Sequence, residues 1–370
     1  MSETYDAIVI GLGGFGSSTL YELAKRGMKV LGIDQFGIAH DQGSSHGETR
    51  IIRRAYFEHP DYVPLLDHTY RMWRELEDES GRDLMNLCGL VLSGPSDGEA
   101  VPGVVLAKEQ HGIAVESLDR KDAAEQFPRI RFPEDHTILR ESDAGYLRVD
   151  DCVQTHCDLA AARGATIRSH EKVVDWSATD AGVTVTTEAS SYLAGKLVVA
   201  CGAWSVQVLK ALGISLTILR KSVFWFPKTV ANSQPWPVFY IEDQGRSFYG
   251  LPGLDEASVK VAEHSGGDTV ADPTNVVRDV NTTERDAVSN FITTTLSGLQ
   301  TQPAAHSVCM YCMSPDGHFI VDQHPGHKNV VIAAGFSGHG FKFTPVIGSA
   351  IADLIDSGRT DLPIGFLGLR

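Results

Sequence analysis

The start of the chain alternates between short apolar runs and one amphipathic segment. Residues 7–10 and 30–33 are continuous apolar runs of the length that buried strands have. Between them, residues 17–25 carry apolar side chains at helical spacing, and Gly27 follows as a helix stop. The pattern predicts a strand, a helix and a second strand, the unit from which parallel sheets are built.

Later segments repeat this pattern. Residues 197–200 form an apolar run that is followed by a glycine and by a predicted helix over 205–212, so we expect a returning strand of the same sheet. The other expected elements are strands at 319–321 and 330–334 and a helix over 344–355 that ends at Ser357 and Gly358. The predicted fold class is α/β, with a second lobe of the α+β type.

A glycine-rich turn joins the first strand to the first helix. Its sequence, G-L-G-G-F-G, puts Gly11, Gly13 and Gly16 in the G-x-G-x-x-G spacing. The first glycine permits a tight turn, the second lets the backbone approach a pyrophosphate, and the third lets helix and strand pack closely. Asp34 ends the second strand, where a carboxylate accepts hydrogen bonds from a ribose 2′-OH. This order predicts a dinucleotide site, against a glycine-rich turn in another α/β protein.

The motif alone does not choose between NAD and FAD. It lies within the first sixteen residues, so we expect no substrate domain before it, and a second strand–glycine–helix element begins at 197. Both features favour FAD.

Composition narrows the classes of partner. The chain has 370 residues, with 32 Lys and Arg against 47 Asp and Glu, which gives a formal charge of −15. Nucleic acids and anionic membranes select basic surfaces, so we expect neither as a partner. No apolar run approaches the ~18 residues of a membrane helix, the start lacks the basic region of a signal peptide, and 6 cysteines are too few for a disulfide scaffold. We expect a cytoplasmic protein.

A basic loop follows the second strand. Residues 43–54 have the sequence G-S-S-H-G-E-T-R-I-I-R-R. A helix over 49–56 would place Arg50 and Arg53 on one face, because they are three residues apart. Two guanidiniums on one face suit a carboxylate or a phosphate. The alternative is a solvated face that pairs with local acids.

A second glycine-rich junction lies near the end of the chain. Gly335, Gly338 and Gly340 follow a predicted strand and precede the predicted helix over 344–355. Backbone without side chains and a helix N-terminus both suit a bound anion, and Lys342 lies at the same end.

Cys309 and Cys312 form a C-x-x-C pair. A thioredoxin-type pair opens a helix in a βαβ unit, whereas here Pro315-Asp-Gly follows and predicts a hairpin turn. No second pair supplies the spacing of zinc ligands. We expect neither a redox dithiol nor a metal site.

Four motifs resemble one enzyme family. They are S-S-H-G-E-T-R-I-I-R at 44–53, F-Y-G-L-P at 248–252, C-M-Y at 309–311 with S-P-D soon after, and G-F-S-G-H-G-F-K-F at 335–343. Together they make the chain similar to the monomeric sarcosine oxidase and N-methyltryptophan oxidase group of FAD-dependent amine oxidases. The similarity extends from Gly11 to Lys342.

With this resemblance we expect a Rossmann-type FAD-binding domain interleaved with an antiparallel-sheet catalytic domain, in which residues 223–227 form a strand. The expected boundaries are 1–80, 150–215 and 309–370 for the first domain and 81–149 and 216–308 for the second. The expected partners are a small-molecule amine substrate and O2, and the expected state is a monomer.

The resemblance also implies how FAD is held. The family attaches FAD through a thioether from a cysteine to the flavin 8α-methyl group, and Cys309 matches because Met310 and Tyr311 follow it. A buried core thiol is the alternative, and Cys312 has no expected role. The expected cofactor-binding residues are Gly11, Gly13, Gly16, Asp34, Ser44, His46, Arg50, Cys309, Gly338, His339, Gly340 and Lys342.

The same resemblance implies the substrate site. Arg53 and Lys342 match two basic groups around the substrate carboxylate, and Lys260 matches a lysine that helps reduced flavin react with O2. An exposed strand lysine is the alternative for Lys260, since a buried lysine needs a reason. The residues that match the cavity lining are Tyr249, His264 and Tyr311. The residues expected to take part in catalysis are Lys260, Arg50, His264 and Tyr249.

The implied reaction is the oxidation of an N-alkyl amino acid, with a hydride equivalent passing to the flavin, hydrolysis of the imine, and reduction of O2 to H2O2. Sarcosine, N-methyltryptophan, cyclic imino acids and glycated amino acids all suit this framework. Residues 252–258 are closer to the N-methyltryptophan branch, and Phe57 and Trp225 add aromatic bulk. A dehydrogenase that uses another electron acceptor and a non-enzymatic dinucleotide-binding protein remain as alternatives.

Overall fold

The first strand, helix and strand of the chain are β1 (Thr4–Ile10), α1 (Gly14–Lys25) and β2 (Val30–Ile33) in the computed structural model, which describes residues 4–229 and 236–370. The two strands pair in parallel, as the apolar runs predict. The returning strand is β12 (Ser191–Val199), which lies parallel to β1, and β19 (His327–Ala334) lies parallel to β12. The expected parallel sheet is therefore confirmed.

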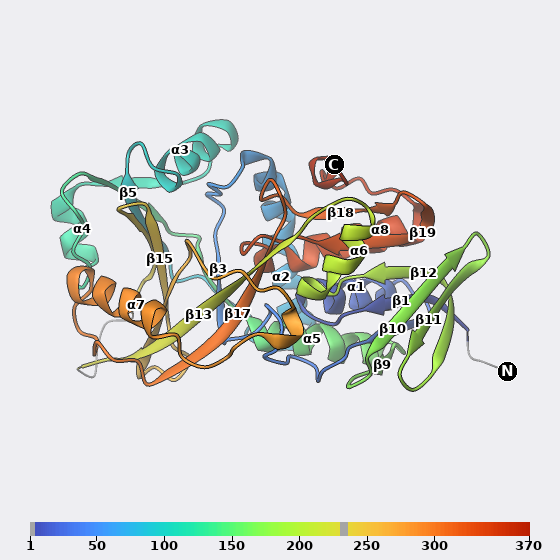
Figure 1. Ribbon diagram of the computed structural model, residues 1–370. Coiled ribbons are helices and arrows are strands. Elements are labelled where there is room, and N and C mark those ends of the chain that lie inside the picture. The colour runs from blue at the N-terminus through green and yellow to red at the C-terminus, as the bar shows by residue number, and fades with distance from the viewer. Residues whose placement is uncertain (1–3, 230–235) are drawn as a thin grey trace.

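Shorter strands complete this sheet at its edges. They are β9 (Thr166–Arg168), β10 (Val173–Thr179), β11 (Gly182–Thr187) and β18 (Ile320–His324). The antiparallel pair of β10 and β11 extends from β12 and forms the outer end of the lobe, drawn at the right of Figure 1.

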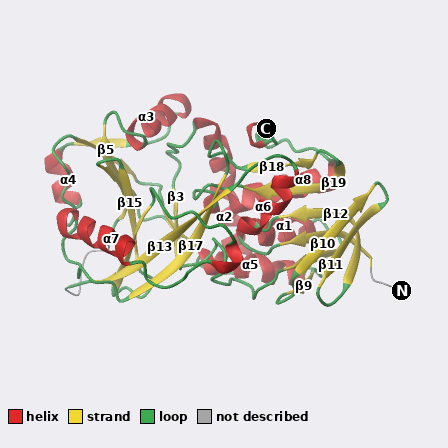
Figure 2. Cartoon of the chain, viewed as in Figure 1, coloured by secondary structure: helices red, strands yellow, loops and turns green. Residues whose placement is uncertain are grey.

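Helices form a layer beside the parallel sheet (Figure 2). α1 packs between α5 (Val149–Ala162) and α8 (Thr344–Ser357), and α2 (Val63–Ser80) packs on α8. α8 has proline in its first turn and Gly358 at its C-cap, with φ 77°, so the helix predicted over 344–355 is confirmed. α6 (Val206–Ala211) follows a 3₁₀ turn after β12.

A second sheet forms the other lobe. Its strand order is β17-β13-β16-β15-β14-β5-β7-β6, and every neighbouring pair is antiparallel except β14 and β5. The bounds are β5 (Leu90–Pro95), β6 (Glu116–Leu118), β7 (His136–Glu141), β13 (Thr217–Pro227), β14 (Val238–Asp243), β15 (Arg246–Pro252), β16 (Ser258–Glu263) and β17 (Ala305–Met313). The strand expected at 223–227 is the second half of β13.

Alternation along these strands separates a packed face from a cavity face. Phe239 and Phe248 point to a hydrophobic core with α4 (Arg120–Gln126) and α7 (Thr282–Thr295), on the outside of the lobe in Figure 1. Their neighbours Tyr240 and Tyr249 point to the opposite face, as the two-residue period of a strand requires. α3 (Ala100–His111) covers the upper edge of that face.

The expectation of a helix over 49–56 is wrong. Residues Thr49–Ile52 form the strand β3, which pairs with β8 (Gly145–Arg148), and β8 also pairs with β4 (Met85–Asn86). Two adjacent isoleucines favour a strand once a partner strand is present. That partner lies almost a hundred residues away, so local spacing could not reveal it.

The expectation of a hairpin at Pro315 is also wrong, because the two strands that the turn connects do not pair with each other. The turn joins β17 to β18, but β17 pairs with β13 and β18 pairs with β19. The turn therefore carries the chain from one sheet to the other. In Figure 1, the long strands β13 and β17 run from the second lobe toward the first.

None of the helices in the described residues is long and apolar enough to cross a membrane.

Candidate active site

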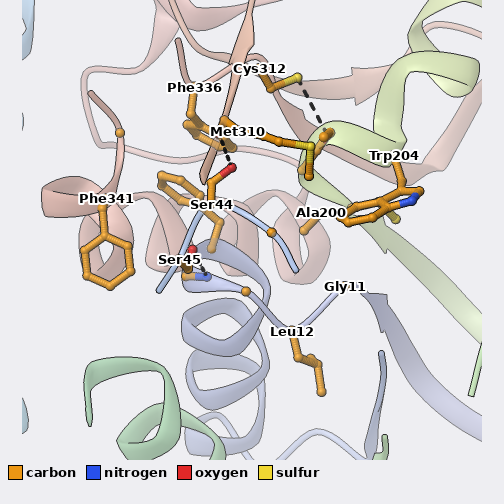
Figure 3. A pocket seen from close by; sticks show the side chains of 18 of the residues that line it. Gly11, Leu12, Ser44, Ser45, Ala200, Trp204, Met310, Cys312, Phe336 and Phe341 are labelled. Atoms are coloured by element: carbon orange, nitrogen blue, oxygen red, sulfur yellow. Dashed lines mark hydrogen bonds between the residues drawn. The ribbon is translucent and has the colours of Figure 1, made fainter. Parts of the chain in front are cut away.

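One cavity of about 750 Å³ runs from the glycine turn of the first lobe to the cavity face of the second sheet. Figure 3 shows its first part, where Gly11 and Leu12 lie opposite Ala200 and Trp204, and where Ser44 and Met310 approach each other. The cavity therefore joins the predicted dinucleotide site to the predicted substrate residues.

The glycine turn has the geometry that a dinucleotide cradle needs. Gly11 has φ 87°, and a Cβ there would lie 2.5 Å from the Ala200 carbonyl oxygen. A Cβ on Gly16 would lie 1.7 Å from the Gly11 carbonyl oxygen, so only glycine lets helix and strand pack this closely. Gly13 lines the cavity at the N-terminus of α1. The cavity and its bare helix end fit the diphosphate of FAD.

Asp34 lies at the end of β2 and lines the same part of the cavity. Its two carboxylate oxygens accept hydrogen bonds from the backbone N–H groups of Leu12 (2.7 Å) and Phe36 (2.8 Å). These bonds fix the acid beside the glycine turn, where each oxygen keeps a lone pair for a ribose hydroxyl.

A serine-rich loop closes over the helix end. Ser45 Oγ accepts a hydrogen bond from the Gly14 N–H (3.0 Å), and Ser44 Oγ donates to the Met310 carbonyl (2.5 Å), as drawn in Figure 3. The loop therefore ties α1 to β17, the strand that carries Cys309.

Arg50 and Cys309 are in direct contact on the cavity wall. Arg50 Nη2 lies 3.5 Å from Cys309 Sγ and 2.9 Å from the Ser44 carbonyl oxygen. Arg50 therefore places a positive charge directly beside the Cys309 thiol. Cys312 lies three residues along the same strand, so its thiol points to the other face and contacts the Gly202 carbonyl. The two cysteines are not arranged as a dithiol pair.

Arg53 and Lys342 lie together at the far end of the cavity, as the resemblance implies. Both side chains are buried, and both lie against the ring of Tyr56, Arg53 Cζ at 4.7 Å and Lys342 Nζ at 5.0 Å from its centroid. Lys342 Nζ donates to the His339 carbonyl oxygen (2.7 Å). Burial and the neighbouring Arg53 charge lower the pKa of Lys342 to about 7.

Glu58 is a cavity residue that the sequence analysis missed. Arg53 Nη2 donates to both of its carboxylate oxygens (2.8 and 2.6 Å), and Arg53 Nη1 donates to the Ala55 carbonyl (2.6 Å). Burial opposes ionisation, but Arg53, with His339 and Lys342, lowers the pKa of Glu58 to about 2. The alternative for the basic loop was a solvated face that pairs with local acids. Arg53 does pair with a local acid, but the pair is buried and not solvated.

Aromatic side chains form the wall next to these charges. His264 Nδ1 and the Tyr311 hydroxyl are 3.1 Å apart, and burial lowers the pKa of His264 to about 3, so the ring is neutral. Phe57 and Tyr240 pack with ring centroids 5.0 Å apart, and Arg53 Cζ lies 4.1 Å from the Phe57 ring. Phe57, Tyr240, Tyr249, His264 and Tyr311 all line the cavity. Trp225 does not line it and donates its indole N–H to Glu48.

The second glycine junction forms part of the cavity near Tyr311. Gly338 has φ 80°, and a Cβ there would lie 2.4 Å from the Tyr311 ring. His339 bonds the Gly317 carbonyl through Nε2 (3.0 Å) and the Tyr56 hydroxyl through Nδ1. Gly338, His339, Gly340 and Lys342 all line the cavity.

Three of the predicted site residues lie behind the cavity wall. Gly16 acts in packing, and His46 bonds the Gly43 carbonyl (3.1 Å). Lys260 is fully buried, and its Nζ donates to the carbonyls of Gly47 (2.9 Å) and Thr49 (2.5 Å). Burial and the Arg50 charge hold the pKa of Lys260 well below its usual range. The alternative of an exposed strand lysine is wrong.

Comparison with known proteins identifies the family. Residues 6–354 match the family described as FAD dependent oxidoreductase. The chain belongs to this family. FAD is therefore its cofactor, and the expectation of a flavin-dependent enzyme is confirmed.

Curated relatives of this FAD-dependent oxidoreductase include the group that its motifs resemble. The chain is 39% identical to the monomeric sarcosine oxidase of Streptomyces avermitilis, with 100% of this chain and 98% of the relative covered. It is 34% identical to the N-methyl-L-tryptophan oxidase of Salmonella dublin, with 94% of each covered. The structure of NikD, an unusual amino acid oxidase, has the same fold, with TM-score 0.90, 24% identity, and 100% and 98% of the chains covered. The expected family and fold class are confirmed.

Proposed function

We propose that the protein is an FAD-dependent oxidase of N-methyl or other N-alkyl amino acids, which releases an aldehyde or keto acid after imine hydrolysis and converts O2 to H2O2. The observation that carries this proposal is the position of Arg53 and Lys342 at the end of a cavity that begins at the dinucleotide turn. The names of the relatives, which include sarcosine oxidases, support the same substrate class.

Arg53 and Lys342 would bind the substrate carboxylate. The guanidinium has five N–H donors, and its bonds to Ala55 and Glu58 leave two of them for a further carboxylate. Two cations against one buried carboxylate leave this end of the cavity with an excess positive charge below pH 7. Two charge-assisted contacts orient the substrate, which is the main contribution that the protein makes to such a reaction.

When bound, FAD supplies the acceptor for the two electrons of the C–N oxidation. The protein's part is to hold the substrate amine in its neutral, electron-donating form beside that acceptor. The rings of Tyr249, Tyr311 and neutral His264 line the cavity and would themselves place no positive charge near the nitrogen. Apolar surroundings disfavour the charged ammonium form, because burial penalises ions.

We also propose that Cys309 carries FAD covalently. Its thiol faces the cavity and has Arg50 as the neighbouring cation, whereas the thiol of Cys312, which also lines the cavity, contacts the Gly202 carbonyl instead. The contact with Arg50 at 3.5 Å places a fixed positive charge beside the sulfur that would form the bond.

Lys260 is proposed to act in the reaction with O2. In its protonated form, this buried lysine would favour the formation of a negative charge nearby, as in the first reduction product of O2. Substituting Lys260→Met should slow flavin reoxidation at least tenfold while flavin reduction by the substrate changes less than threefold. Stopped-flow absorbance would measure both rates, and equal losses in both would reject this role.

Acid precipitation of the purified protein, followed by an H2O2 assay with sarcosine and N-methyltryptophan, tests the main proposal. Yellow pellets and peroxide release are expected. Flavin reduction without peroxide would favour the dehydrogenase that uses another acceptor, and no reduction by any N-alkyl amino acid would reject the proposal. We also propose the interleaved domain boundaries given above and a monomeric state.

A further inference from the structure

A buried lysine that does not line the cavity lies directly behind two residues that do. Lys221 is in β13, next to β17, and only 5% of its surface is exposed. Its Nζ donates to the carbonyl oxygens of His264 (2.7 Å), Ser265 (2.7 Å) and Gly266. The same Nζ lies 5.1 Å from the centroid of the Tyr311 ring.

The turn after β16 is shaped around this ammonium group. An ammonium group has three N–H donors, and three consecutive carbonyls accept them. Gly266 has φ 62° and Gly267 has φ 112°, conformations that glycine adopts without strain. A Cβ on Gly267 would lie 2.7 Å from the Arg220 carbonyl oxygen, 3.1 Å from Lys221 Cε and 3.3 Å from Nζ, so the turn closes tightly over β13 at the lysine.

These contacts reach both members of one hydrogen-bonded pair on the cavity wall. Lys221 holds His264 through the backbone carbonyl, while the His264 N–H donates to the Ser247 carbonyl (2.7 Å). It holds Tyr311 through a cation–π contact. The side chains of His264 and Tyr311 meet at 3.1 Å. A shift of the turn would therefore move both side chains at once.

We propose that Lys221 is a positioning residue that fixes His264 and Tyr311 against the substrate from behind the cavity wall. This inference rests on the proposed function, because it takes the wall formed by these two residues as the substrate's contact. An arginine has a planar fork of donors, which does not match three carbonyls that converge on one point. Lysine is the side chain that supplies donors in this geometry.

Lys221→Met removes all three donors and keeps most of the volume. We expect the rate of flavin reduction at saturating sarcosine to fall at least tenfold, because small displacements of a bound substrate cost this much. Reoxidation by O2 should stay within twofold. Lys228→Met is the matched control, since Lys228 follows β13 and donates to one carbonyl, that of Glu256. It should leave both rates unchanged.

A double-mutant cycle separates positioning from a general loss of structure. In the His264→Ala/Tyr311→Phe background, Lys221→Met should lower the reduction rate less than threefold further, because the groups that it positions, the His264 imidazole and the Tyr311 hydroxyl, are already absent. An undiminished loss in that background, or no loss in the single variant, would overturn the proposal.

Two further variants keep the proposal testable if Lys221→Met does not fold. Gly267→Ala pushes the turn away from an unchanged lysine and should give the same selective loss of reduction. Gly213→Ala is its control, with a similar φ of 80° and nothing within 4 Å of the added Cβ.

The crystal structure of the FAD-loaded Gly267→Ala variant decides the matter independently of turnover. A broken contact between His264 and Tyr311 is expected, and an unchanged pair would refute the inference. If the wild-type protein oxidised no N-alkyl amino acid, the proposed function would fail while this structural result would still stand.

Discussion

Four basic side chains around the cavity, those of Arg50, Arg53, Lys260 and Lys342, donate most of their hydrogen bonds to main-chain carbonyls. A carbonyl dipole stabilises a buried cation without cancelling its charge, unlike a carboxylate. Glu58 is the carboxylate that hydrogen-bonds one of these four side chains, Arg53. The field in the cavity therefore stays positive, which suits a carboxylate substrate and a cofactor that accepts electrons.

Removal of one thiol tests the covalent link. Cys309→Ser should leave all FAD in the supernatant after acid precipitation, because Cys309 is the cysteine of β17 whose thiol contacts Arg50 and the loop at Ser44. Cys312→Ser, which changes the opposite face of the same strand, should keep the pellet yellow. Acid-stable flavin in Cys309→Ser would show that another residue forms the bond.

The titration of Lys342 predicts how carboxylate affinity depends on pH. Its pKa in the free protein is about 7, so the ammonium charge is present below that pH and is lost as pH rises above it. The dissociation constant of methoxyacetate, an unreactive substrate analogue, should be flat below pH 7 and rise up to tenfold per pH unit above it. His264 and His339, with pKa values of about 3 and 4, stay neutral throughout.

Titration of the flavin absorbance with methoxyacetate at pH 6 to 9 would measure this effect. Lys342→Met should bind more weakly at pH 6 and should lose the dependence. A constant affinity in the wild-type protein would contradict the assignment of Lys342 to the carboxylate.

At the scale of elements, continuous apolar runs predicted the strands of the parallel sheet because those strands are buried on both faces. The strand β3 was missed because its pairing with β8 depends on contacts between distant segments. The partners of Lys260 were hidden for the same reason, since Gly47 and Thr49 precede it by more than two hundred residues. Motifs therefore located residues that line the cavity, while the contacts among them required the folded chain.

The turn before α8 gives a test at this scale. Gly338→Ala places a Cβ 2.4 Å from the Tyr311 ring in a backbone conformation with φ 80°. The free energy of unfolding should fall by about 2–4 kcal/mol from strain and overpacking together. Gly358→Ala, with φ 77° and its nearest neighbour at 3.7 Å, should lose only about 1–2 kcal/mol. Urea unfolding of both variants would measure the difference, and equal losses would contradict the predicted clash.

Across the whole molecule, the chain passes between the two sheets several times, and both sheets contribute walls to one cavity. FAD bound along this cavity would contact both lobes. Binding energy for FAD should appear as stability of the entire fold, since a ligand stabilises whatever must be folded to bind it.

Cofactor linkage is measurable in the Cys309→Ser variant, from which flavin should dialyse away. At a free concentration one hundred times its dissociation constant, FAD should stabilise the protein by about 2.7 kcal/mol. FMN at the same concentration should do much less, because it cannot use the adenosine end at Gly11, Gly13 and Asp34. Equal thermal shifts with FAD and FMN would place the cofactor differently.

The two ends of the cavity come from segments that are far apart along the chain. Gly11 and Lys342 line the same cavity, although more than three hundred residues separate them. During translation, the nucleotide turn leaves the ribosome more than three hundred residues before the lysine. The nascent chain therefore cannot complete this cavity until residue 342 has been synthesised, so termination at any earlier codon yields a polypeptide without a complete cavity.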